Sequence, residues 1–168
     1  MAKKVIWATV FAVVAIILQS TLLSRLSVYI HAVPDIALVI LVFTAYVNGT
    51  TTGQLTGFCS GLLMDFLSAA PLGLNAFIRT ILGALGGFMN GSFFLDTLFL
   101  PMVLCAGATL LKALLLYALH ILFAGEVAAY GITEPTLWVE LVLNTLSAPF
   151  LFAFLKLFKP LLAERRES

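Results

Sequence analysis

Charged residues are scarce in this sequence. They make up 10% of its 168 residues, and the formal net charge is only +1. A soluble domain is typically about 25% charged, because its surface faces water. The scarcity of charge therefore excludes a soluble globular domain. The small net charge also gives no general attraction to nucleic acid.

Cysteine and histidine are also rare, with two residues of each. Cys59 and Cys105 both lie within apolar segments, which is typical of small core residues rather than of a disulfide framework. His31 and His120 are isolated in the sequence. We therefore expect no metal site.

No motif for catalysis or cofactor binding is present. The segment GFCSG at 57–61 resembles the rhomboid protease motif only loosely, because Phe58 stands where that motif has glycine. Asp65 lies in LLMDF, without the preceding glycine of the intramembrane aspartyl proteases. The glycines recur at helical spacing within apolar runs, unlike those of a phosphate-binding loop. The sequence thus predicts no catalytic residue and no cofactor.

Long apolar runs dominate the chain. Hydrophobic residues make up 62% of it, and the mean hydropathy is +1.12. We predict an all-α membrane protein, a single domain over residues 1–168 with six transmembrane helices. The first run follows Lys3 and Lys4 and has no cleavage site after it, so we interpret it as an uncleaved helix. The predicted helices are 5–23, 34–47, 53–67, 73–89, 98–123 and 136–158.

The basic residues predict how these helices are oriented. Six spans would place both termini on the same side of the membrane, and most of the lysines and arginines flank that side. Arg25 is the only lysine or arginine in the loops on the opposite side. By the positive-inside rule, both termini are then cytoplasmic. The flanking basic residues are Lys3, Lys4, Lys156, Lys159, Arg165 and Arg166.

Glycines are concentrated in the segment 49–91, which holds nine of the twelve. Several of them are four residues apart, a spacing that places them on one face of a helix. Small residues on a helix face allow close approach of another helix in a membrane. We expect these glycines to serve either helix packing or contact with a partner's transmembrane helix. They are Gly53, Gly57, Gly61, Gly83 and Gly87.

Ionisable and polar residues inside the apolar segments form a second feature. With the predicted topology, the charged ones come from five helices and fall in the outer half of the membrane. Such residues usually pair with one another or face a cavity. We predict the pairs Asp65 with Arg79 and Lys112 with Glu140, the alternative being that each side chain extends separately to the interface. The candidate polar cluster comprises Asp35, Asp65, Asn75, Arg79, Lys112 and Glu140.

Two of these positions have a local sequence context of their own. Asp35 follows Pro34 at the start of a predicted helix, where a carboxylate interacts favourably with the helix dipole. Asp35 is therefore either a helix-start residue or a functional one. Glu140, Asn144 and Ser147 are spaced by four and three residues, which places them near one face of the last predicted helix.

The chain resembles the MreD family of bacterial rod shape-determining membrane proteins. The resemblance is carried by a Pro-Asp helix start, a glycine ladder that ends at an aspartate, a Pro-Leu-Gly turn followed by Asn-Ala, and the glycine-rich segment 83–87. Length, span number and short tails agree with it. The motif residues are Pro34, Asp35, Gly57, Gly61, Asp65, Pro71, Gly73 and Asn75.

The resemblance implies a function and a fold. It implies a non-enzymatic scaffold of the cell-elongation complex in the bacterial cytoplasmic membrane, which binds MreC. The wider complex would include MreB filaments, RodA and a class B penicillin-binding protein. The fold would be similar to the substrate-binding S components of energy-coupling-factor transporters. The alternative function is therefore a vitamin-type S component, with Ala8 and Ala12 on its partner-binding face and the polar cluster as its pocket.

Overall fold

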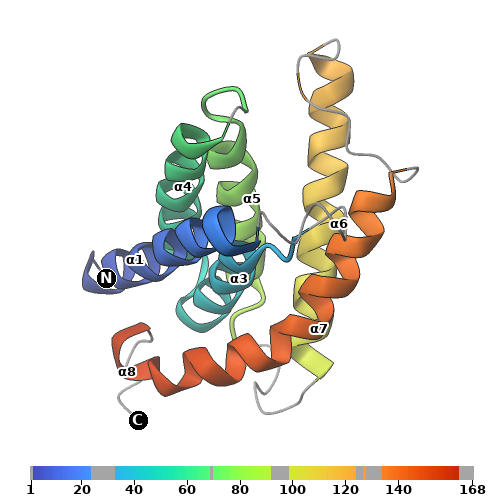
Figure 1. Cartoon of the computed structure of the whole chain (residues 1–168). Coiled ribbons are helices and arrows are strands. Elements are labelled where there is room, and N and C mark those ends of the chain that lie inside the picture. The colour runs from blue at the N-terminus through green and yellow to red at the C-terminus, as the bar shows by residue number, and fades with distance from the viewer. Residues whose placement is uncertain are drawn as a thin grey trace.

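The structure of the chain is a computed structural model that describes residues 2–23, 33–68, 70–91, 99–123, 127 and 134–162. Helices account for 88% of these residues, and no strand occurs among them. The elements are α1 (Ala2–Leu18), the π-helical turn η1 (Gln19–Leu23), α3 (Ile36–Asn48), α4 (Thr50–Leu67), α5 (Leu74–Phe88), α6 (Phe99–Leu122), α7 (Pro135–Leu157) and α8 (Lys159–Leu162) (Figure 1). The predicted helix 5–23 corresponds to α1 and η1 together, and each of the other five corresponds to one element from α3 to α7. The ends then differ by at most three residues. Hydropathy does not predict the short helix α8.

The all-α membrane fold class is confirmed. Three helices among the described residues are long and apolar enough to span a membrane, namely Lys3–Thr21, Phe99–Leu122 and Pro135–Leu157. Ile36–Asn48 and Leu74–Phe88 are apolar but shorter. Helix α4 has 18 residues, but its polar first turns, TTTGQ, lower its hydropathy. The count of six spans stays a prediction.

The orientation in the membrane also stays a prediction. Arg25, Arg165 and Arg166 lie outside the described residues, as does His31. Contact between α1 and α8 brings the first and last described helices together. This proximity agrees with termini on one side of the membrane.

Helix α3 forms the centre of the fold. It contacts α1, α4, α5, α6 and α7, and every residue from Ala37 to Tyr46 is buried. Phe43 packs edge-on against Phe152 of α7, with ring centroids 5.1 Å apart. A helix that is apolar on all sides is typical of a protein core or of a membrane span, and α3 lies in the core.

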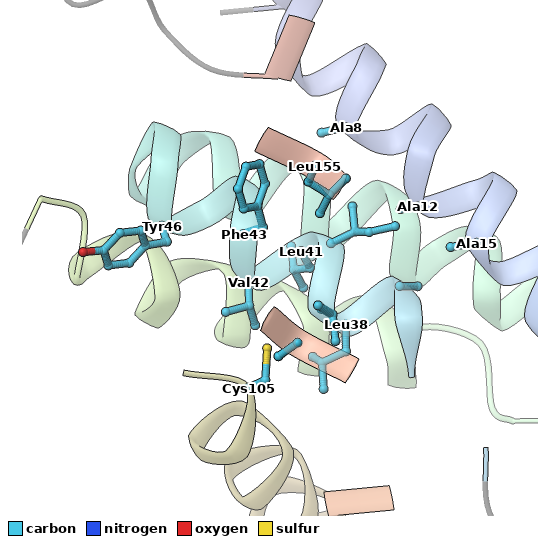
Figure 2. Packing of buried hydrophobic residues seen from close by; sticks show 14 of the residues in the cluster. Ala8, Ala12, Ala15, Leu38, Leu41, Val42, Phe43, Tyr46, Cys105 and Leu155 are labelled. Atoms are coloured by element: carbon cyan, nitrogen blue, oxygen red, sulfur yellow. The ribbon is translucent and has the colours of Figure 1, made fainter. Parts of the chain in front are cut away.

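Helix α1 covers α3 with a stripe of small residues. Ala8, Ala12 and Ala15 are buried and lie over Leu38 and Leu41 in the core (Figure 2). The partner-binding face that the alternative S-component function would place at Ala8 and Ala12 is therefore wrong. Because these side chains are small, α1 packs close to α3, and the alanines are not available to bind another protein.

The antiparallel helices α4 and α5 pack with their backbones in near contact. A Cβ atom added at Gly57 would collide with the backbone of Arg79, and one added at Gly61 with the backbone of Ala76. Gly53 and Gly83 face each other in the same way. Of the two roles expected for the glycines, the structure shows helix packing. A glycine-lined groove for a partner is wrong for these faces, because each helix fills the groove of the other.

The last long helix bends towards the start of the chain. Helix α7 curves as it leaves α6 and passes to α8 (Figure 1), and Pro149 within it removes one backbone hydrogen bond. Asn48 Nδ2, at the end of α3, donates to the Leu162 carbonyl at 2.6 Å. This bond holds α8 against the central helix.

A candidate functional site where four helices meet

Asp35 is placed by its position at the start of α3. Its Oδ1 accepts from the Leu38 amide at 2.9 Å, so it is the N-cap of the helix. A helix N-terminus favours an anion, because the first amide groups have no carbonyl partners within the helix. The helix-start interpretation is therefore confirmed. The same carboxylate also faces two cations, so capping is not its only contact.

Arg79 reaches Asp35 from α5. Its Nη2 donates to Asp35 Oδ1 at 2.8 Å and to Oδ2 at 3.0 Å, and it contacts Met64 Sδ at 3.1 Å. Both charged side chains are nearly fully buried, at 4% and 3% exposure. A charge this deep is stable only with an opposite charge close by. Arg79 and Asp35 thus join α5 to the start of α3.

Lys112 connects the same carboxylate to α7. Its Nζ lies 3.0 Å from Asp35 Oδ2 and 2.7 Å from Glu140 Oε1. The predicted contact between Lys112 and Glu140 is present. The Lys112 side chain is 17% exposed, more than the side chains of Asp35, Arg79 and Glu140. We call Asp35, Arg79, Lys112 and Glu140 the charged cluster.

Asn144 and Thr109 complete the site on its apolar side. Asn144 Oδ1 accepts from the Asp35 amide at 2.7 Å, and its Nδ2 donates to Thr109 Oγ1 at 3.0 Å and more weakly to Glu140 Oε1 at 3.4 Å. Neither residue was among the candidates. The four-residue spacing from Glu140 to Asn144 was visible in the sequence. Nothing in the sequence pointed to Thr109, which lies three residues before Lys112 on α6.

The predicted pair of Asp65 with Arg79 is wrong. Asp65 accepts instead from the amides of Gly73, Asn75 and Ala76 at 2.9–3.1 Å, and from Asn75 Nδ2 at 2.9 Å. These are the orphan amides at the start of α5, so Asp65 caps that helix from its neighbour. The six candidates therefore divide into the charged cluster and a separate cap formed by Asp65 and Asn75.

The charged cluster links four helices. Its two carboxylates and two cations balance, and beyond Asn144 the interior becomes apolar at Cys105, Ala148 and Phe152. No group of three or more histidine, cysteine or acidic residues that could hold a metal occurs in the described part of the chain. The cluster ties α3 and α5 to the pair α6 and α7.

Comparison with protein families gives a match that covers almost the whole chain. The model for "rod shape-determining protein MreD" matches residues 1–158. The chain belongs to the MreD family. MreD is a membrane family with a role in determining rod shape, which agrees with the apolar helices and confirms the resemblance found in the sequence.

Comparison with curated proteins and with solved structures gives no match. The expected similarity to transporter S components thus stays a prediction. The family places this protein among shape-determining membrane proteins.

Proposed function

We propose that this MreD protein is a non-enzymatic scaffold of the cell-elongation complex in the bacterial cytoplasmic membrane. In this role it binds MreC and helps couple MreB filaments to peptidoglycan synthases, including RodA and a class B penicillin-binding protein. The observation that carries the proposal is the family match over residues 1–158. A described region made mostly of helices, five of them apolar, suits an assembly partner inside the membrane.

The structure limits where a partner helix could bind. The glycine faces of α4 and α5 are occupied by each other, and the alanine face of α1 is occupied by α3. Exposed apolar residues instead follow the outer face of α6, including Val103, Leu110, Leu114 and Ile121. The alternative of an S component loses its small-residue docking face, because Ala8 and Ala12 are buried.

Co-purification tests the scaffold function. The tagged protein should retain MreC when both are expressed together, and cells without the protein should lose rod shape. Rods of normal shape without it, or a protein that never retains MreC, would contradict the proposal. Val103→Trp and Leu114→Trp on α6 can be compared with Phe58→Trp on α4 to find the partner face, since all three side chains are exposed.

A further inference from the structure

The two sides of the protein have different heights. Helix α6 has 24 residues and is about 36 Å long at 1.5 Å per residue, whereas α5 has 15 residues and is about 22 Å long. The hydrocarbon core of a bilayer is about 30 Å thick. Helix α6 can fit such a core by tilting. Helix α5 is too short to span this core, and tilting would reduce its height further.

The apolar part of the exposed surface of α4 is shorter than the helix itself. Thr51 and Gln54 are exposed and polar at one end, and exposed Ser68 follows the other end. From Gln54 to Ser68 the chain rises by about 21 Å. Exposed apolar side chains lie between these limits, among them Phe58 and Phe66. The α4 face thus offers lipid an apolar band of about two thirds of the usual thickness.

The packing of α4 against α5 prevents one helix from extending the band of the other. Gly53 lies against Gly83 and Gly61 against Ala76, so the two short helices are level along their whole length. Next to α5 the exposed apolar side chains lie between Leu72 and Met89, and the helix itself is about 22 Å long. Helix α3 adds no height, since it is buried. Helix α1 contacts α4 and crosses this side obliquely to α6 (Figure 1), and together with η1 it is itself long enough to span a membrane. Any thinning of the bilayer therefore concerns the lipid that contacts α4 and α5 directly.

We propose that the α4–α5 side of the protein contacts a locally thinned bilayer, while the α6 side contacts a bilayer of ordinary thickness. The occupant of the α4–α5 face is lipid whose acyl chains are shortened or disordered to match a band of about 21 Å. The protein therefore imposes a thickness gradient across its own width and prefers short-chain lipid on one side. This inference concerns the bilayer and does not depend on which proteins the scaffold binds.

Depth measurements on the purified protein in dioleoyl-phosphatidylcholine bilayers test the proposal directly. Nitroxide labels are attached one at a time to Gln54→Cys and Ser68→Cys, with Phe99→Cys and Leu122→Cys on α6 as the matched pair. Cys59→Ala removes the accessible native thiol, and fully buried Cys105 stays in place. Both α4 labels should lie at headgroup depth, although they are only about 21 Å apart. If either α4 label lies deep in the hydrocarbon, the bilayer is not thinned and the proposal is overturned.

A second measurement needs no label. Thermal unfolding is compared in dimyristoleoyl-, dioleoyl- and dierucoyl-phosphatidylcholine. The midpoint should be lowest in the longest chains, where the mismatch with α4 and α5 is greatest while α6 fits with less tilt. The variant with Thr51→Leu and Gln54→Leu lengthens the apolar band of α4 and should shift the preferred chain length upwards. Gln54→Asn keeps the band unchanged and is the control. A preference that is the same for all three proteins, or highest in the longest chains, would contradict the proposal.

Discussion

At the glycine positions of the interface between α4 and α5 no side chain separates the two backbones, whereas charged side chains fill the region where α3, α5, α6 and α7 meet. In the first, glycines let two backbones approach until an added methyl group would collide with the opposite chain. In the second, Asp35 holds Arg79 and Lys112 at 2.8–3.0 Å in the interior. Both solve the same problem, since apolar helices in lipid gain little from hiding apolar surface from each other.

The two interfaces differ in what they tolerate. The backbone contact is disrupted when a side-chain atom is added at one of its glycines, and it does not depend on charge. The charged cluster fails when one partner is removed, because a buried charge is then left unpaired. Adding a methyl group should therefore be costly at the glycines of α4 and α5, and removing a charge should be costly in the charged cluster. The following predictions test this contrast.

The largest effect is expected for Asp35→Ala. It leaves Arg79 buried without its carboxylate, removes one partner of Lys112 and removes the cap of α3. Loss of one partner from a buried ion pair costs about 3–5 kcal/mol. Denaturant titration in bicelles should show this loss relative to the wild type. A loss below about 1 kcal/mol would mean that the charges are not buried as the structure places them.

The next effect is expected for Gly57→Ala. The added Cβ would meet the backbone of Arg79, so α4 and α5 must separate, at a cost of about 1–3 kcal/mol or more. Gly107→Ala on α6 is the matched control, because nothing lies within 4 Å of its Cβ position. There the change should be neutral or stabilise the helix by up to about 1 kcal/mol. Equal effects at both sites would remove the distinction between the interfaces.

A smaller effect is expected for Asp65→Ala. It removes the acceptor for three amides at the start of α5 and should destabilise the protein by about 1–2 kcal/mol. Hydrogen exchange of the Asn75 and Ala76 amides should accelerate, while exchange within α3 stays slow. The predicted pairing with Arg79 would instead make Arg79→Leu and Asp65→Ala strongly non-additive, which the structure does not support.

The smallest effect is expected in a double-mutant cycle of Lys112→Met and Glu140→Gln. Lys112 is partly exposed, so solvent weakens its interaction with Glu140, and we expect a coupling energy of about 0.5–1 kcal/mol. The same cycle on Asp35 and Arg79 should give a larger value, because both of those side chains are buried. The opposite order would place the centre of the cluster at Lys112 instead of Asp35.

The pairing partners show where sequence reasoning stopped. Spacing by four residues correctly grouped the glycines, because the period of one helix determines which residues share a face. It could not tell which face of α4 meets which helix, so packing and partner contact both remained open. For Arg79 the nearest acid along the hairpin was Asp65, and only the position of α3 beside α5 made Asp35 the partner.

The sequence by itself determined the all-α membrane class, the family through its glycine ladder and Pro-Asp start, and the helix ends to within three residues when η1 is counted with α1. These depend on local composition and helical period, which act within one segment. The tertiary structure decided that the small-residue faces are internal, that Asp65 caps α5, and that Asp35 is the centre of the charged cluster. These depend on how separate helices are placed side by side, and close contacts between residues as distant as Asp35 and Asn144 leave no period in the sequence.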